Sequence, residues 1–504
     1  MNLVRLADET ITTFGEYPFL VFDDRVYTNR EILRKANGLA ASLQGLGLQK
    51  EEKVVVMLPN CPEVIISYQG ILRAGGVIVP LIPLLNGKEL AHILANCEAA
   101  AMITNGDIFL KNEALLRGHA TVKNVIVTDE KTLPGTHSLP AMIEKPPGAF
   151  SPPVIDELDL AVILYTAGTT SSPKGVMLTH RNLYSNAVNA ARAHDTRPSD
   201  ITLVALPLSH SFGLTSMNKA YQYGNLHVLM RKFQPDEAFR LIEKYRVTDF
   251  PGAPAMFIAL LASPLANRYD LSSLKSCLSG AAPFPVASLL AFQKKFNCTV
   301  YEAYGLSEAS PAVSTNYHHR PTKPGSIGQP LPEVEVRIVD DDERDVPRGN
   351  VGELLVRGPN VSSGYYRQPE ETARTFRNGW LHTGDMARMD EDGYLYIVER
   401  KKDLIIRGGF NIYPRDLEEI LYTHPAVGDA VAIGIPDPVM GEEIKVYVVL
   451  KEGATASAED LHQYCREHLA KNKWPRQIEL ATSLPRNPMG KILRRELRRL
   501  NAGA

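Results

Sequence analysis

Short apolar runs alternate with amphipathic stretches of helical periodicity over most of this 504-residue chain, from about residue 20 to about residue 400. A continuous apolar run of this kind is typical of a strand that is buried on both faces, as strands are in parallel sheets covered by helices. The alternation therefore predicts α/β layers with largely parallel sheets. The runs that carry this prediction are residues 54–58, 77–79, 101–103, 125–127, 201–206 and 299–301.

The pattern changes near Val334. Apolar residues alternate with charged ones up to Ile338, and another apolar run at 354–357 follows a Gly-Glu turn. Strict alternation is typical of a strand with one face on the core and one in water, so this region predicts a small antiparallel β section.

The last hundred residues indicate a separate small α+β unit. Two strands are predicted at 430–435 and 444–450, and Ser457-Ala-Glu-Asp460 is a capping-box start for a helix. We place the boundary at the charged cluster 399–403. The chain is thus divided into a large N-terminal domain over residues 1–400 and a small C-terminal domain over residues 401–504.

Composition excludes several classes of protein. The formal net charge of -2 gives no electrostatic reason to expect nucleic acid as a partner. Five cysteines without a CxxC pair indicate reduced thiols. The charged N-terminus lacks the apolar core of a signal peptide, and the most apolar region, 54–85, is broken by prolines, glycines and charges. We therefore expect a cytoplasmic protein without an integral membrane segment.

Residues 165–175 concentrate hydroxyls, glycines and one lysine directly after the apolar run 160–164. Small residues let a backbone approach an anion, hydroxyls donate to phosphate oxygens, and Lys174 adds a positive charge. The segment is not a Walker A loop, because Gly175 rather than serine or threonine follows the lysine. We expect a phosphate-binding loop between this strand and a helix capped by Thr179, with an ordinary surface turn as the alternative.

Two further segments place chemically useful side chains in turns. In residues 301–308, the ring of Tyr304 can stack on a base, and the carboxylate of Glu308 can hold Mg²⁺ beside phosphates. In residues 380–385, the two oxygens of Asp385 can accept from both hydroxyls of a ribose. Each segment alone is more often a turn than a site, so their joint occurrence carries the prediction.

The chain resembles the adenylate-forming superfamily, which includes acyl-CoA synthetases, aryl-CoA ligases, beetle luciferase and the adenylation domains of peptide synthetases. The resemblance covers essentially the whole chain and is most like a fatty acyl-CoA synthetase. It rests on five motifs in the same order: the loop at 165–175, Tyr-Gly-Leu-Ser-Glu at 304–308, Trp-Leu-His-Thr-Gly-Asp at 380–385, Glu-Arg-Lys-Lys-Asp-Leu-Ile-Ile-Arg-Gly-Gly-Phe-Asn-Ile-Tyr-Pro at 399–414, and Pro-Arg-Asn-Pro-Met-Gly-Lys at 485–491.

This resemblance implies a set of residues for the nucleotide. Glu308 would be the Mg²⁺ ligand and act in catalysis with Thr166, while Asp385 and Arg400 would bind the ribose. The residues implied to surround the phosphates and the adenine of ATP are Thr166, Gly168, Thr169, Thr170, Lys174, Gly280, Ala281, Ala282, Tyr304, Gly305 and Ser307.

The resemblance also implies that the C-terminal domain is mobile about a hinge near Lys402. Lys491 would reach into the site and act during adenylation, and Gly408 with Gly409 would afterwards line the channel for the pantetheine arm of coenzyme A. His210 would lie beside the acyl substrate and act there, with a packed, hydrogen-bonded histidine as the alternative.

The loop departs from the family pattern at Ala167 and Ser171, where the family commonly has serine and glycine, and Ser307 stands where it commonly has threonine. Ala167 removes one possible phosphate donor, whereas Ser307 keeps its hydroxyl. No residue with a necessary charge is lost, so we expect an active enzyme.

The implied function is an ATP-dependent carboxylic acid:CoA ligase that uses ATP, Mg²⁺ and coenzyme A, forms an acyl-adenylate and releases AMP and pyrophosphate. A medium- or long-chain fatty acid is the expected substrate, and a homodimer the expected assembly. Three alternatives stay open: an aryl acid, a small dicarboxylic acid bound by a buried cation such as Lys219, and loading of a separate carrier protein. A non-enzymatic nucleotide-binding relative is disfavoured, because Glu308, Asp385, Arg400 and Lys491 are all present.

Overall fold

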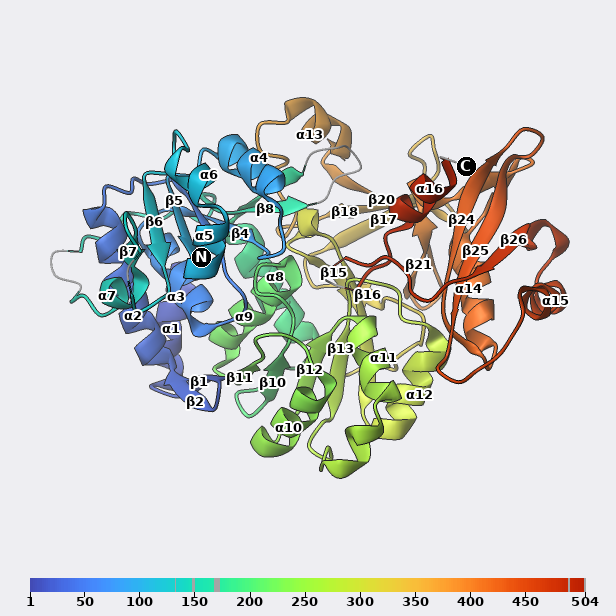
Figure 1. Ribbon diagram of the computed structural model, residues 1–504, viewed down its shortest axis with the longest axis horizontal. Coiled ribbons are helices and arrows are strands. Elements are labelled where there is room, and N and C mark those ends of the chain that lie inside the picture. Colours follow the sequence, from blue (N-terminus) through green and yellow to red (C-terminus); the bar gives the residue numbers. More distant parts are fainter. Residues whose placement is uncertain (132, 147–149, 167–172, 488–489, 503–504) are drawn as a thin grey trace.

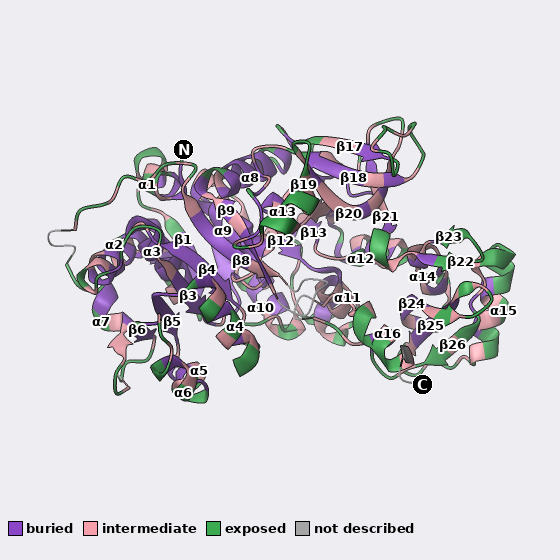
Figure 2. Cartoon of the chain, turned by 90° about the horizontal axis from the view of Figure 1, so that it is seen from above, coloured by how far each residue is buried: buried purple, intermediate pink, exposed green. Residues whose placement is uncertain are grey.

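The computed structural model describes residues 1–131, 133–146, 150–166, 173–487 and 490–502. It has a large N-terminal domain of α/β layers, which carries a small antiparallel β section, and a smaller α+β C-terminal domain (Figure 1). Buried residues concentrate in the strands of both domains (Figure 2). The predicted fold class is confirmed, whereas the boundary at residue 400 and the mobility of the C-terminal domain stay predictions.

One sheet of the N-terminal domain has seven strands in the order β7-β6-β5-β3-β4-β8-β9. Its neighbouring pairs are parallel except for β8 and β9, and β4 is buried along its whole length. The strands are β3 (Lys53–Met57), β4 (Val77–Leu81), β5 (Ala101–Thr104), β6 (Asn124–Val127), β7 (His137–Ser138), β8 (Leu160–Thr166) and β9 (Lys174–Thr179).

Helices cover both faces of this sheet, which explains its continuous apolar runs. Val54 and Ile78 pack with α2 and α3 on one face, while Val55 and Val77 pack with α4 on the other. The helices of this part are α1 (Leu3–Phe14), α2 (Asn29–Gly45), α3 (Pro62–Arg73), α4 (Gly87–Cys97), α5 (Gly106–Lys111), α6 (Glu113–Arg117) and α7 (Leu139–Ile143).

The second large sheet has nine strands in the order β16-β15-β14-β13-β12-β10-β11-β1-β2, parallel from β14 to β1 and antiparallel at both edges. The prediction of largely parallel sheets is therefore confirmed. The strands are β1 (Pro18–Phe22), β2 (Arg25–Thr28), β10 (Ile201–Val204), β11 (Leu226–Leu229), β12 (Asp249–Gly252), β13 (Ser276–Ser279), β14 (Thr299–Gly305), β15 (Ala312–Thr315) and β16 (Gln329–Pro330).

The helices that follow in this domain include α8, whose N-cap Thr179 accepts from Asn182 in a capping box as predicted. They are α8 (His180–Ala193), α9 (Ser211–Tyr223), α10 (Pro235–Tyr245), α11 (Pro254–Ala262), α12 (Val286–Phe296) and α13 (Pro369–Thr375), with short 3-10 turns η1 (Pro264–Arg268) and η2 (Ser307–Ala309). Within the described ranges, no helix is both long enough and apolar enough to cross a membrane.

The structure corrects the expected strand–loop–helix order around the phosphate loop. The loop joins β8 to the antiparallel strand β9, and α8 begins only after β9 ends. The reason is that the buried Val176 and Leu178 alternate with the less buried Met177 and Thr179 and pair with β8, so the residues after the loop extend the sheet at its edge. Gly168, Thr169 and Thr170, together with Ala167 and Ser171, lie outside the described residues.

The predicted antiparallel section and C-terminal unit are both present. The section comprises β17 (Glu335–Val339), β18 (Gly352–Arg357), β19 (Phe376–Arg377), β20 (Trp380–Met389) and β21 (Leu395–Arg400), followed by the turn η3 (Lys401–Asp403). The C-terminal elements are β22 (Ile405–Arg407), β23 (Phe410–Ile412), α14 (Pro414–Thr423), β24 (Val427–Asp437), β25 (Gly441–Leu450), α15 (Ala458–His468), η4 (Lys471–Lys473), β26 (Gln477–Leu480) and α16 (Arg494–Ala502). All five cysteines are free and buried.

Candidate active site

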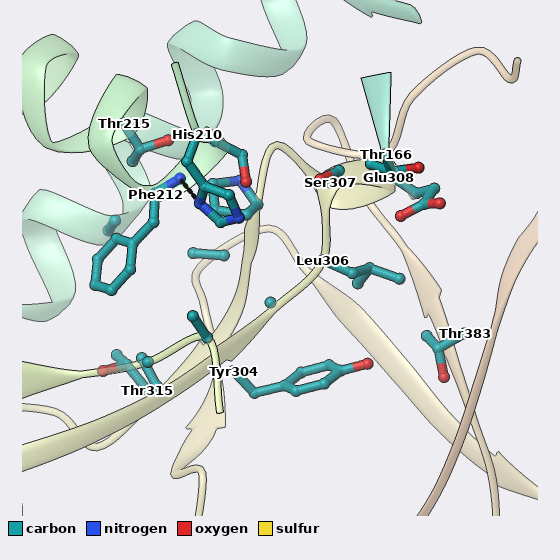
Figure 3. A pocket seen from close by; sticks show the side chains of 18 of the residues that line it. Thr166, His210, Phe212, Thr215, Tyr304, Leu306, Ser307, Glu308, Thr315 and Thr383 are labelled. Atoms are coloured by element: carbon teal, nitrogen blue, oxygen red, sulfur yellow. Dashed lines mark hydrogen bonds between the residues drawn. The ribbon is translucent and has the colours of Figure 1, made fainter. Parts of the chain in front are cut away.

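A cavity of about 520 Å³ opens where the two large sheets, the antiparallel section and the C-terminal domain meet. Thr166, Ser307 and Glu308 lie on one side of it and His210, Phe212 and Thr215 on another (Figure 3). The cavity brings together most of the residues singled out in the sequence: Thr166, Lys174, His210, Gly280, Ala281, Tyr304, Gly305, Ser307, Glu308, Arg400, Lys402 and Lys491.

Four of the predicted residues do not line this cavity. Ala282 follows the lining residue Ala281 but is not itself part of the lining, and Asp385 is covered by its neighbours. Gly408 and Gly409 form the exposed turn between β22 and β23, both with positive φ, in the C-terminal domain. In this arrangement the domain therefore presents Lys491 to the cavity and holds the two glycines away from it.

Asp385 links the aromatic and the basic side chain predicted around the nucleotide. It pairs with Arg400 across β20 and β21, and Arg400 Nε lies 3.0 Å from its Oδ1. The Tyr304 hydroxyl donates to its other oxygen, Oδ2. Asp385 raises the pKa of Arg400, and burial raises the pKa of Tyr304 well above its ordinary value. Each carboxylate oxygen can still accept a second hydrogen bond, but Asp385 is buried here and does not line the cavity, so its contact with a ribose stays a prediction.

Glu308 is held in the short turn η2 directly after β14. The Tyr365 hydroxyl donates to Glu308 Oε1 at 2.8 Å, which fixes one end of the carboxylate. The turn depends on Gly305, because a Cβ there would lie 2.3 Å from the carbonyl oxygen of Pro311. The chain thus positions Glu308 and Ser307 by a close backbone approach that only glycine allows.

Lys174 lies at the start of β9 and is buried. Its ammonium forms an ion pair with Glu371 of α13 and lies 5.4 Å from the centre of the Tyr365 ring. Sequence reasoning missed Glu371 and Tyr365, since both lie almost two hundred residues from Lys174 in segments that carry no recognised motif. The carboxylate of Glu371 therefore holds the Lys174 ammonium at the cavity without the help of a ligand.

Lys491 reaches the cavity from the C-terminal domain, close to Arg400 and Lys402. Burial, together with the positive charge of Arg400, lowers the pKa of Lys491 to about 8, and the charge of Asp385 opposes this shift. Burial and Arg400 also lower the pKa of Lys402. Three cations thus share one region, which favours binding of a polyanion there.

His210 is the N-cap residue of α9, and its Nδ1 accepts from the backbone N–H of Phe212 at 3.2 Å. Burial lowers the pKa of His210 to about 4, so the ring is neutral at physiological pH. The hydrogen bond to its own helix agrees with the alternative of a packed histidine, and the side chain also lines the cavity, but its place beside the acyl substrate stays a prediction.

The deeper part of the cavity is lined by polar side chains that the sequence pattern did not group together. They come from α8, α9 and the starts of strands β10 to β12, and they are His194, Thr202, Lys219, Asn225, His227 and Asp249. Of these, only Lys219 stood out in the sequence. The others could have been noticed as polar residues next to or within otherwise apolar strands.

Comparisons with known proteins agree with this geometry. The model of the AMP-binding enzyme family matches residues 7–366, and that of the AMP-binding enzyme C-terminal domain matches residues 416–491. A long-chain-fatty-acid–CoA ligase of Bacillus subtilis (strain 168) is 40% identical over 526 residues, which cover 98% of this chain and 94% of that protein.

Two solved structures have the same architecture. Anthranilate CoA ligase AuaEII, in complex with anthranoyl-AMP, superposes with a TM-score of 0.94 at 28% identity and covers 100% of this chain and 98% of its own. ATP-bound MatB from Rhodopseudomonas palustris has a TM-score of 0.92 at 30% identity, with 99% of both chains covered. With both family models matched in the expected order, the chain belongs to the AMP-binding enzyme family.

Proposed function

We propose that this protein is an ATP-dependent carboxylic acid:CoA ligase. In the first step an oxygen of the acid attacks the α-phosphorus of ATP, the bond to the bridging oxygen breaks, and pyrophosphate leaves. In the second step the sulfur of coenzyme A attacks the acyl carbon, its proton is released, and AMP leaves. The observation that carries the proposal is that one cavity gathers Thr166, Lys174, Glu308, Arg400 and Lys491 from motifs spread over the whole chain.

The residues supply what this chemistry needs, since a carboxylate must approach a polyanion and displace another one. Lys491 and Lys174 would neutralise charge on the phosphates, and the hydroxyls of Thr166 and Ser307 would donate to their oxygens. Tyr304 and the backbone of Gly280 and Ala281 would form the walls for adenine. The pair formed by the buried Asp385 and the partly exposed Arg400 would hold the ribose.

A magnesium ion fits Glu308 only in company with the nucleotide. Among the residues that the structure describes, no group of three or more histidine, cysteine, aspartate or glutamate side chains could hold a metal ion. Mg²⁺ is commonly bound through one or two carboxylates together with substrate phosphates. Glu308 would therefore hold a Mg²⁺ that arrives with ATP, and the ion would offset charge on the leaving pyrophosphate.

The two steps would use different faces of the C-terminal domain. Lys491 faces the cavity, whereas Gly408 and Gly409 are exposed outside it. Rotation about a hinge near Lys402 would exchange these faces and bring the glycine turn to the pantetheine channel.

An aliphatic fatty acid is the proposed substrate, because the Bacillus subtilis relative named above is a long-chain-fatty-acid–CoA ligase and is matched over nearly its whole length.

The test measures two reactions: acid-dependent exchange of labelled pyrophosphate into ATP, and formation of acyl-CoA when coenzyme A is added. We expect both with aliphatic acids. We expect Glu308→Gln to lower exchange about a hundredfold, and the exposed Glu452→Gln to leave it unchanged. Absence of exchange with every acid would overturn the ligase assignment. Exchange without thioester formation would overturn coenzyme A as acceptor and favour a carrier protein.

A further inference from the structure

The wall of the cavity formed by helix α9 is unexpectedly polar for a site that binds a fatty acid. Phe212, Thr215, Ser216 and Lys219 line the cavity, and their spacing of three, four and seven residues places them on one face of the helix. Because a helix rises 1.5 Å per residue, Lys219 lies roughly 10 Å beyond Phe212 along this wall. The wall therefore runs from the region of His210, which is predicted to lie beside the acyl substrate, to an ammonium group.

A second part of the lining, formed by strands β10 to β12, also carries a row of polar side chains. Thr202 of β10 pairs in register with His227 of β11 and with Asp249 of β12, so the three residues share one face of the sheet. They stand at or near the amino ends of parallel strands, whereas Gly280 follows the carboxyl end of the neighbouring strand β13. The cavity thus extends along the strands, away from the residues proposed to bind the nucleotide.

Within the described part of the chain, Lys219 has a hydrogen-bond acceptor but no carboxylate counter-ion. Its Nζ lies 3.2 Å from Nδ1 of His194, and Nε2 of His194 lies 2.9 Å from the Thr315 hydroxyl. Lys219 can donate to Nδ1 only if the imidazole is neutral, and burial lowers the pKa of His194 well below its ordinary value. Among the described residues, no carboxylate forms an ion pair with Lys219 within 4.0 Å.

The nearby acids do not replace such a partner. Asp249 accepts from the Ser276 hydroxyl at 2.8 Å, and burial raises its pKa, so its carboxyl is already committed to a neighbouring strand. Burial lowers the pKa of Lys219, opposed by the charges of Asp249 and Asp200. Burying an ammonium beside an alkyl tail would be costly, whereas an incoming anion would satisfy it.

We propose that the preferred acid is an aliphatic chain with a second carboxylate at its far end, which Lys219 binds at the deep end of the cavity. The hydroxyl of Thr202 and the neutral ring of His227 would donate further hydrogen bonds to it. This proposal rests on the proposed ligase function and replaces the simple fatty acid named there by a medium-chain dicarboxylic acid as the preferred substrate. The roughly 10 Å of wall between Phe212 and Lys219 sets the length of the alkyl spacer.

The test compares octanoic acid, its ω-hydroxy derivative and suberic acid, which share one chain length, by kcat/KM in the pyrophosphate exchange assay. The wild-type enzyme is expected to prefer suberic acid to octanoic acid by more than about tenfold. Lys219→Met should lower kcat/KM for suberic acid about a hundredfold, because one partner of a buried ion pair is removed. It should raise kcat/KM for octanoic acid, since the tail then meets an apolar side chain.

The exposed Lys294→Met on α12 is the matched control and should change neither value. The wild-type comparison needs no variant, so misfolding of Lys219→Met would leave the proposal testable. A wild-type preference for octanoic acid would overturn the proposal while preserving the ligase function. A wild-type preference for the ω-hydroxy acid would also overturn the proposal, because Lys219 would then recognise a neutral hydrogen-bonding group instead of a second carboxylate. Absence of exchange with all three would contradict the ligase function itself.

Discussion

At the residue scale, the charge on Lys491 is the feature on which adenylation should depend most. The side chain comes from the C-terminal domain and shares the cavity with Arg400 and Lys402. Desolvation and the neighbouring Arg400 hold its pKa near 8, so it is charged at neutral pH with little margin. The neighbouring cations that favour binding of a polyanion also lower the pKa of Lys491, so the charge of this side chain depends on pH just above neutrality.

We predict that kcat/KM for ATP in pyrophosphate exchange falls as the pH rises through about 8. Lys491 carries its proton below its folded-state pKa and loses it above, and only the ammonium form neutralises phosphate charge. The profile is measured at constant ionic strength. Lys491→Arg should remove this decline, because arginine stays protonated throughout. A decline that persists unchanged in Lys491→Arg would assign it to another group.

At the element scale, the turn that follows β14 shows how backbone packing places a functional side chain. Gly305 lets the chain approach Pro311 closely, and the Tyr365 hydroxyl then holds Glu308 from a distant segment. The β8–β9 hairpin works in the same way, since it carries Lys174 to Glu371 of α13. Neither contact can be inferred from the local pattern of the strands.

We predict that Gly305→Ala destabilises the fold by roughly 1–3 kcal/mol, because the added methyl overlaps the Pro311 carbonyl and must push the turn aside. Displacement of Glu308 should lower the rate of adenylation about a hundredfold. Thermal unfolding and pyrophosphate exchange are measured on the same preparation. Gly45→Ala, at the exposed end of α2 with no atom within 4 Å of the added Cβ, should be neutral or slightly stabilising. Equal behaviour of the two variants would contradict the steric argument.

At the scale of the whole molecule, the C-terminal domain is tied to the N-terminal domain by a small set of polar contacts. Arg494 of α16 lies 3.5 Å from Glu399 of β21, and Arg415 of α14 donates to the Ile397 carbonyl at 2.7 Å. Polar contacts of this kind are typical of interfaces between domains that move relative to one another, in contrast to a large apolar interface. Such an interface suits a domain that presents Lys491 in one step and the Gly408–Gly409 turn in the other.

We predict that Gly409→Leu separates the two steps. The residue has a positive φ and no atom within 4 Å of an added Cβ, and it lies outside the cavity. Pyrophosphate exchange should therefore stay within about twofold of wild type, while a leucine facing the pantetheine channel should lower acyl-CoA formation more than about tenfold. Gly453→Leu, equally strained and equally open, is the control and should preserve both activities. A parallel loss of exchange and thioester formation in Gly409→Leu would rule out the proposed exchange of faces.

The sequence by itself determined the layered α/β fold, the antiparallel section, the capped helices α8 and α15, and a minority of the residues that line the cavity, Lys174, Glu308 and Lys491 among them. These signals are local, because hydrophobic period and capping chemistry act over a few residues. Only the tertiary structure decided that β9 completes a hairpin, that Glu371 pairs with Lys174, and that Lys219 stands among polar side chains from three strands. Those contacts join segments up to 197 residues apart, where packing of whole elements sets the geometry and no local pattern records it.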